Sequence, residues 1–198
     1  MDMGVGESPL RIVRNSAPGQ KLTNFVQLSH LRRMRGSEQV AAICYRVRKG
    51  EIEFLLVQTD GGRWTFPKGS VESGLTDAQS AALEAFEEAG VHGRIEEAAF
   101  AHYVKRKSAG MIRPAGIEVV INTHLCEVLW LEEPKELDRN PTWYSIEKAK
   151  RRLGERRTSE DGTEHGRIVD LAVTRIRLWH DSFAAQRTRN TTSSRRKR

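Results

Sequence analysis

The sequence has no long hydrophobic run, no apolar leader and only two cysteines. No stretch approaches the roughly 20 apolar residues that a membrane helix needs, so we expect no membrane segment. Residues 1–20 lack the apolar core of a secretory signal. Cys44 and Cys126 lie in apolar, strand-like runs, which favours buried free thiols over a disulfide or a metal site. Together these absences predict a globular protein of the cytoplasm.

Metal binding through histidine and cysteine is also not indicated. The chain has six histidines, and none stands at zinc-ligand spacing from either cysteine. The sequence therefore does not indicate a zinc site of this kind.

Positive charge is concentrated at the two ends of the chain. The net charge is +7, of which residues 1–37 carry +4 and residues 187–198 carry +6, leaving −3 for residues 38–186. Such ends can bind nucleic acid weakly and with strong salt dependence. Solvated, disordered tails are the more common outcome, and the folded centre gives no indication of a nucleic-acid-binding domain.

The order of the expected elements predicts an α+β fold. Strands come first, then a helix, then strands, then helices, an order that suits helices flanking a mixed sheet. We expect an irregular arm at 1–37, a central domain at 38–157 and a disordered basic tail at 187–198. Residues 158–186 should form a polar loop to Gly166 and a helix that packs on the domain or at a homodimer face. The other expected elements are a strand near 40–45, a turn at Lys49-Gly50, a return strand at 52–57, a helix at 78–89 capped by Thr76 and Gln79, a basic loop at 105–114, and a strand at 117–128.

Three glutamates of the 78–89 helix share one face. Glu84, Glu87 and Glu88 stand at positions i, i+3 and i+4. Like charges at this spacing destabilise an isolated helix by roughly 0.2–0.5 kcal/mol per pair, and the C-terminal half of a helix disfavours anions. A hard divalent cation with oxygen ligands would offset both effects.

An alternative interpretation is that these glutamates are ordinary solvated surface residues, which is the more common fate of such a cluster taken alone. Two features of the context favour a site. The opposite helix face is small and apolar, so it can pack closely on a sheet and fix the acidic face. The preceding segment, 68–74, is a glycine-punctuated loop whose N–H groups can approach phosphate.

These residues resemble the Nudix box, G-x5-E-x7-R-E-U-x-E-E-x-G-U, where U is a bulky aliphatic residue. Ala85 stands at the first U, where a larger residue is usual. The lead-in 64–69, the opening strand 43–46 and the late pair Trp143-Tyr144 most resemble the diphosphoinositol-polyphosphate phosphohydrolase branch of that superfamily. The resemblance covers about residues 38–155. The matching box positions are Gly69, Glu84, Glu87, Glu88, Gly90 and Val91.

Two box positions depart from the pattern. Leu75 replaces the family's glutamate and Leu83 replaces its arginine. A buried ion pair can be exchanged for a packed apolar pair without loss of stability, whereas losing one partner is costly. We therefore expect Leu75 and Leu83 to touch, and the exchange puts the catalytic rate in doubt.

The resemblance implies a Nudix-type α/β/α sandwich and a hydrolase that cleaves phosphoanhydride bonds by attack of water on phosphorus. Mg²⁺, with Mn²⁺ as an alternative, would be held by Glu84, Glu87 and Glu88. The substrate would be a phosphorylated small molecule, a nucleoside- or inositol-type diphosphate or polyphosphate. Two alternatives remain: a 5′-triphosphate RNA pyrophosphohydrolase, and a catalytically weak Nudix fold that binds a phosphorylated ligand as a regulatory module.

Residues outside the helix supply further candidates, each with a plainer alternative. The general base would be a box glutamate or a nearby acid; Glu118 and Glu127 are candidates, although ordinary strand residues are the more common case. Trp64, Trp143 and Tyr144 could stack on a base, but aromatics beside strands usually pack internally. The candidates for binding substrate phosphates are Arg63, Lys68, Gly69, Lys105, Arg106, Lys107 and Arg113, and solvated loop residues are the alternative for the 105–107 cluster.

Overall fold

The computed structural model describes residues 39–107 and 117–195 of the 198-residue chain. The irregular arm expected at 1–37 lies outside these residues, as does Arg113. Within the described part, no helix is both long and apolar enough to cross a membrane.

Among the described residues, eight strands form one mixed sheet. Its centre consists of β1 (Gln39–Arg48) and β7 (Ile117–Leu131), which run parallel. The other neighbours pair antiparallel, and the order along the main path is β3-β2-β1-β7-β5. β4 pairs with β1, β6 with β7 and β8 with β2. The remaining strands are β2 (Glu51–Gln58), β3 (Trp64–Thr65), β4 (Lys68–Ser70), β5 (Val91–Ile95), β6 (Ala101–Lys107) and β8 (Thr142–Ser145).

The turn expected at Lys49-Gly50 joins β1 to β2. Both residues have positive φ, 54° at Lys49 and 82° at Gly50, and Arg48 pairs with Glu51 across the ladder. Positive φ at both central positions matches the right-handed twist of a hairpin. The turn therefore fixes the register of β1 and β2.

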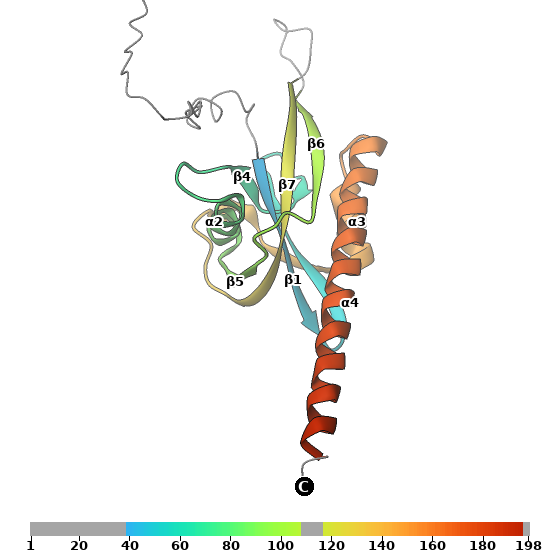
Figure 1. The fold of residues 1–198 in the computed structure, drawn as a ribbon. Helices are drawn as coiled ribbons and strands as arrows, with labels where there is room; N and C mark the ends of the chain where they lie inside the picture. The colour runs from blue at the N-terminus through green and yellow to red at the C-terminus, as the bar shows by residue number, and fades with distance from the viewer. Residues whose placement is uncertain (1–38, 108–116, 196–198) are drawn as a thin grey trace, which may run out of the picture. The chain divides into compact units, whose positions relative to one another are not determined.

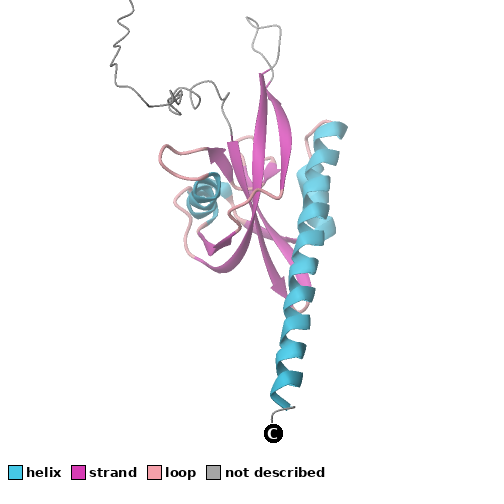
Figure 2. Ribbon diagram, in the orientation of Figure 1, coloured by secondary structure: helices cyan, strands magenta, loops and turns pink. Residues whose placement is uncertain are grey.

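Helices cover both faces of the sheet, as the predicted fold class requires. α2 (Asp77–Ala89) lies on one side of β1 and β7, and α3 (Ile146–Gly154) and α4 (Ser159–Arg195) lie on the other (Figure 1). A short 3₁₀ turn, η1 (Leu137–Arg139), lies between β7 and β8. α4 continues beyond the end of the sheet (Figure 2).

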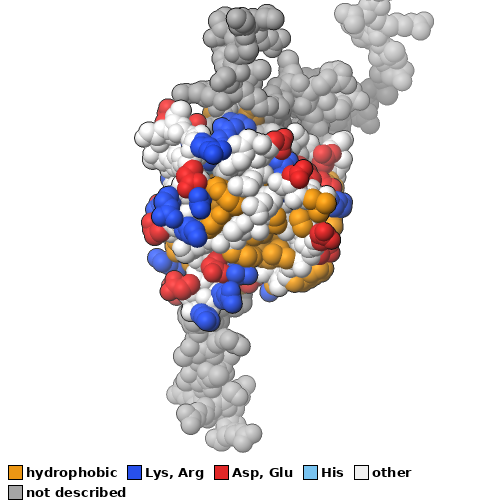
Figure 3. Space-filling model, turned by 180° about the vertical axis from the view of Figure 1, so that it is seen from behind, with side chains coloured by type: hydrophobic (Ala, Val, Ile, Leu, Met, Phe, Trp, Pro, Cys, Tyr) orange, Lys and Arg blue, Asp and Glu red, His pale blue; other side chains and the backbone are white. Residues whose placement is uncertain are grey.

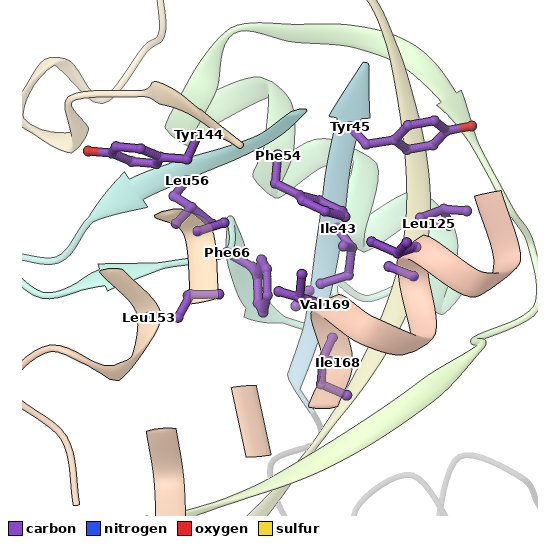
Figure 4. Close-up of a cluster of buried hydrophobic side chains, with 14 of the residues drawn as sticks. Ile43, Tyr45, Phe54, Leu56, Phe66, Leu125, Tyr144, Leu153, Ile168 and Val169 are labelled. Atoms are coloured by element: carbon purple, nitrogen blue, oxygen red, sulfur yellow. The ribbon is translucent and has the colours of Figure 1, made fainter. Parts of the chain in front are cut away.

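Alternate residues of β1 belong to two separate hydrophobic cores. Val40, Ala42 and Cys44 pack with the alanines of α2. Ala41, Ile43 and Tyr45 face the other core, where Phe66 and the α4 residues Ile168 and Val169 meet them (Figure 4). A strand that is buried on both faces accounts for the continuous apolar run read from the sequence.

The two cysteines are free and buried, as predicted. Cys44 of β1 lies directly opposite Cys126 of β7 in the parallel ladder. Contact with Cys126 and burial raise the pKa of the Cys44 thiol well above its usual value. Both thiols therefore belong to the core beneath α2.

The prediction of a polar loop from Thr158 to Gly166 was wrong, because α4 begins at Ser159. The Thr158 hydroxyl accepts a hydrogen bond from the Asp161 N–H at 3.2 Å, which caps the helix. Gly162 looked like a loop residue, but it allows α4 to approach α3, since a Cβ there would lie 3.3 Å from Gly154 Cα. The helix also extends to Arg195, into the segment expected to be a disordered tail.

The basic cluster 105–107 was also assigned to the wrong kind of element. It ends strand β6, where Lys105 pairs with Val119 of β7. Pairing with β7 keeps this segment extended. The composition of the segment does not reveal this pairing, because the partner strand lies further along the chain. The rest of the expected loop, 108–114, lies outside the described residues.

The back of the described domain carries charges of both signs. Figure 3 shows hydrophobic side chains gathered across the middle of this face, with lysine, arginine and acidic side chains scattered around them. Interspersed charges do not form a single-sign field. This face therefore has no broad basic surface of the kind that binds nucleic acid through its phosphates.

Candidate active site

The helix that carries the glutamates is fixed at both ends and along one face. The Thr76 hydroxyl accepts from the Gln79 N–H and the Gln79 side chain accepts from the Thr76 N–H, so the predicted capping box is confirmed. Gly90 ends the helix in the left-handed conformation, with φ of 64°. The buried face packs on β1. Its apolar residues are Ala78, Ala81, Ala85 and Ala89, and the last three share a core cluster with β1.

Glu88 is the buried member of the three glutamates. It is only 3% exposed, whereas Glu84 and Glu87 are partly exposed. One carboxylate oxygen accepts the backbone N–H of Lys68 at 3.1 Å, and the other lies 3.2 Å from the guanidinium of Arg139. Burial raises the pKa of Glu88, while the charges of Lys68 and Arg139 oppose that rise.

Glu84 packs directly on the backbone of Gly69. A Cβ at position 69 would overlap the Glu84 carboxylate, so only glycine leaves room for it. Burial, followed by the charges of Glu88 and Glu87, raises the pKa of Glu84 to about 7. The structure thus brings the box glycine and the first helix glutamate into contact, which the motif spacing alone did not predict.

Glu87 faces a segment that the sequence did not indicate. The ammonium of Lys135 lies 3.2 Å from the Glu87 carboxylate and above the ring of Phe86. The backbone N–H of Glu136 donates to the carbonyl of Glu87 at 3.0 Å. Glu136 also adds negative charge near Glu84, since it contributes to the raised pKa there.

The basic candidates are distributed unevenly around the glutamates. Lys68 is the central one. Burial is the largest cause that lowers its pKa to about 8; Glu88 opposes this shift, and the charges of Lys105, Arg139 and Arg157 add to it. Lys105 is exposed and lies near enough to influence Lys68. The side chains of Arg106 and Lys107 lie outside the described residues.

Arg63 and Arg157 form the outer part of this basic region. Arg63 is exposed, and its charge contributes to lowering the pKa of Arg157 below its usual value, although burial of Arg157 is the larger cause. Arg157 donates to the Leu153 carbonyl at the end of α3. Sequence reasoning missed Arg157 because it follows a helix far from the motif and has no spacing relation to it.

The aromatic candidates pack within the domain. Trp64 and Tyr144 are buried and meet edge to face with ring centroids 5.1 Å apart. Trp143 is covered by the guanidinium of Arg46 at 4.1 Å from its ring centre. The internal-packing alternative therefore describes these residues.

Of the two outside acids, Glu127 does not join the helix glutamates. Glu127 pairs with Arg94 at 3.4 Å, on the strand pair β5–β7. The side chain of Glu118 lies outside the described residues. Glu136 is instead the outside acid that the structure brings to the helix.

The three glutamates fit a hard cation by chemistry, but they do not converge as they stand. No group of three or more His, Cys, Asp and Glu side chains is arranged as a metal site among the residues described. Glu87 turns toward Lys135 and Glu88 toward Arg139. The Glu87–Lys135 pair is exposed and therefore weak, so turning Glu87 inward requires little energy. Carboxylate oxygens are the ligands that Mg²⁺ prefers.

The fold and this site define a known class of protein. A sequence model of the NUDIX domain matches residues 37–162, well over half of the chain. The chain therefore belongs to the Nudix family, and the prediction of an enzyme of the Nudix hydrolase class is confirmed at the level of the family.

Solved structures share the architecture at low identity. An Ap4A hydrolase of C. elegans in a binary complex is 23% identical, with 70% of this chain and 99% of that chain covered and a TM-score of 0.51. The NUDIX domain of Shewanella oneidensis NrtR complexed with ADP ribose is 13% identical, covering 76% and 98%, with a TM-score of 0.54. A NUDIX hydrolase from Nitrosomonas europaea is 20% identical, covering 66% and 88%, with a TM-score of 0.50. These likenesses confirm the predicted Nudix-type α/β/α sandwich. Comparison with curated proteins finds no match.

Proposed function

We propose that the protein is a Mg²⁺-dependent hydrolase that cleaves a phosphoanhydride bond of a nucleoside- or inositol-type diphosphate or polyphosphate. The observation that carries the proposal is the acidic face of α2, where Glu84 and Glu88 are partly or fully buried against Gly69 and Lys68. Burying like-charged carboxylates together is unfavourable unless a cation joins them. Mn²⁺ would serve in place of Mg²⁺.

Each residue of the site has a task in this proposal. Glu84, Glu87 and Glu88 would hold the cation, which would act as a Lewis acid and neutralise charge developing on the phosphate oxygens. Lys68 presents a half-desolvated positive charge beside them, and Gly69 leaves the backbone open to close approach. A box glutamate, or Glu136 beside them, accepts the proton of the attacking water.

Lys105 and the more distant Arg63 would hold the outer phosphates. Both lie in the basic region around Lys68. Arg106 and Lys107, next along β6, stay candidates for the same task. A substrate with several phosphates would use such an extended basic region, because each phosphate contact needs its own donor.

Several substrates satisfy this chemistry. The names of two similar structures, an Ap4A hydrolase and a domain complexed with ADP ribose, support a nucleotide with linked phosphates. The opening strand 43–46, the lead-in 64–69 and the pair Trp143-Tyr144 resemble the diphosphoinositol-polyphosphate phosphohydrolase branch. This resemblance supports a diphosphoinositol polyphosphate as the substrate. The experiment is therefore a panel: dinucleoside polyphosphates, ADP-ribose, diphosphoinositol polyphosphates and 5′-triphosphorylated RNA, each incubated with Mg²⁺ in ¹⁸O-labelled water. Label in a phosphate product shows attack of water on phosphorus; no product from any member with either Mg²⁺ or Mn²⁺ would contradict the proposal.

A second candidate is a ligand-binding module with little turnover. Two observations favour it: Glu87 and Glu88 are engaged by cations of the same chain, and leucines stand at two box positions. Tight binding of a panel member without hydrolysis would support the module. If RNA is the substrate, removal of residues 187–198 should weaken its binding and reduce the salt dependence.

A further inference from the structure

The segment Glu132–Arg139 holds the C-terminal end of α2. The Glu132 N–H donates to the Gly90 carbonyl at 2.9 Å, and a Cβ on Gly90 would overlap the Glu132 carbonyl. Four residues further along the chain, the Glu136 N–H donates to the Glu87 carbonyl at 3.0 Å. Backbone bonds thus tie this segment to the helix residue that precedes Glu88.

Arg139, at the end of this segment, reaches back to the buried glutamate. Its guanidinium lies 3.2 Å from Glu88 and 2.6 Å from Glu136, and 3.7 Å from the exposed Asp60. The Arg139 side chain is only 22% exposed, and that of Glu88 only 4%. An ion pair with so little solvent is stronger and more rigid than a surface pair.

We infer that Arg139 is a positioning residue that fixes the carboxylate of Glu88 for cation binding. This inference rests on the proposed function. It gives a task to a residue outside the box, whose own arginine position holds Leu83, a side chain that cannot donate a hydrogen bond. Glu136 holds the guanidinium, and the guanidinium and the Lys68 N–H together hold one rotamer of Glu88.

Glu88 keeps the capacity to bind a cation while it is held. Each carboxylate oxygen offers about two lone-pair directions, and each oxygen of Glu88 uses one, for Lys68 and for Arg139. A group that orients a metal ligand in this way typically changes metal affinity or activity by 10- to 100-fold when it is removed.

Charge alone predicts the opposite effect, which makes the inference testable. Removing a positive charge beside a cation site reduces repulsion and should tighten cation binding. Lys135 provides the matched control, since it lies in the same segment and pairs with Glu87, but its side chain is 57% exposed. Arg139→Gln and Lys135→Gln remove the same charge, and only the first removes a buried contact.

The test measures Mn²⁺ affinity by calorimetry and by electron paramagnetic resonance, with no substrate present. We expect Arg139→Gln to weaken Mn²⁺ binding by roughly 10- to 100-fold, Arg139→Lys to recover part of the loss, and Lys135→Gln to leave affinity unchanged or tighter. Unchanged or tighter binding in Arg139→Gln overturns the inference. Weaker binding to the same degree in both glutamine variants also overturns it, because the effect would then not depend on the buried contact.

A second measurement separates this inference from the proposed function. Melting temperatures of the metal-free protein are compared for Arg139→Gln, Glu88→Gln and the double variant. If Arg139 holds Glu88, the double variant should melt at about the temperature of the less stable single variant; a drop equal to the sum of the two single drops overturns the inference. A wild type that binds no Mn²⁺ contradicts the proposed function, and this comparison still decides whether Arg139 fixes Glu88.

Discussion

The carboxylate of Glu84 occupies the space that a side chain at Gly69 would fill. This contact joins the loop before α2 to the acidic face of the helix. It explains why the motif begins with glycine: the requirement is for room beside the backbone, because Gly69 is not among the glycines with positive φ.

The first prediction follows from that contact. Gly69→Ala should displace the Glu84 carboxylate and lower kcat/KM by roughly 10- to 100-fold, since small misplacements of reacting groups have effects of this size. Stability should change by less than about 1 kcal/mol, because the end of a glutamate side chain can move and alanine restricts the unfolded chain. Steady-state kinetics and urea unfolding measure the two quantities.

Gly154→Ala is the control for this substitution, because a Cβ at Gly154 would meet nothing within 4 Å. It should leave kcat/KM unchanged. If Gly69→Ala is as active as the control, Glu84 has no part in the reaction in the position seen here.

The second prediction concerns the two leucines of the motif. Leu75 and Leu83 are both partly exposed, and neither belongs to the two buried clusters of the described residues. The expected contact between them stays a prediction. Leu75→Glu and Leu83→Arg should each destabilise the protein by about 1–2 kcal/mol, and the double variant should be less destabilised than the sum by at least about 0.5 kcal/mol. Equilibrium unfolding of all four proteins gives the coupling, and additive values would show that the residues act separately.

The third prediction concerns pH and His165, which lies against Tyr103 and Phe66 in the core. Burial, aided by the charge of Arg157, lowers the pKa of His165 from 6.5 to about 4. At a pH between these two pKa values, His165 takes up a proton in the unfolded chain but stays neutral in the folded protein. Stability from this group is therefore complete above pH 6.5 and falls as pH drops toward 4.

The size of this effect follows from the two pKa values. Lowering the pH from about 7.5 to about 5 should reduce stability by about 2 kcal/mol through His165 alone. His165→Gln should lose this part of the pH dependence, as measured by urea unfolding at both pH values. Equal pH dependence in the two proteins would mean that the folded protein accepts the proton at His165 without difficulty.

Local features of the sequence predicted the parts of the site that are close along the chain. Glu84, Glu87 and Glu88 share a helix face because of their spacing, and the capping box of Thr76 fixed where that helix begins. Gly69 was identified by its spacing along the sequence from the glutamates of the same helix. Each of these features depends on contacts between near neighbours, which a pattern in the sequence records directly.

The partners from distant segments could not be predicted in this way. Arg139 meets Glu88 only because η1 folds back on the end of α2. Arg157 approaches Lys68 only because α3 and α4 pack on the other face of the sheet and carry the residues between them toward Lys68. Gly162 was read as a loop residue, although a helix packed closely against another helix also selects glycine. These contacts arise from tertiary packing, for which the sequence carries no fixed spacing.

Whether the acidic face of α2 carries cation-dependent hydrolysis can be tested by comparing the wild type with a variant that lacks two of its carboxylates. Wild type and Glu87→Gln/Glu88→Gln are incubated with the best member of the substrate panel while Mg²⁺ is varied from none to saturation. We expect turnover by the wild type that requires Mg²⁺ and turnover at least about 100-fold lower in the variant, with folding confirmed by circular dichroism. Turnover by the wild type without a divalent cation, or equal turnover by the folded variant, would contradict this expectation.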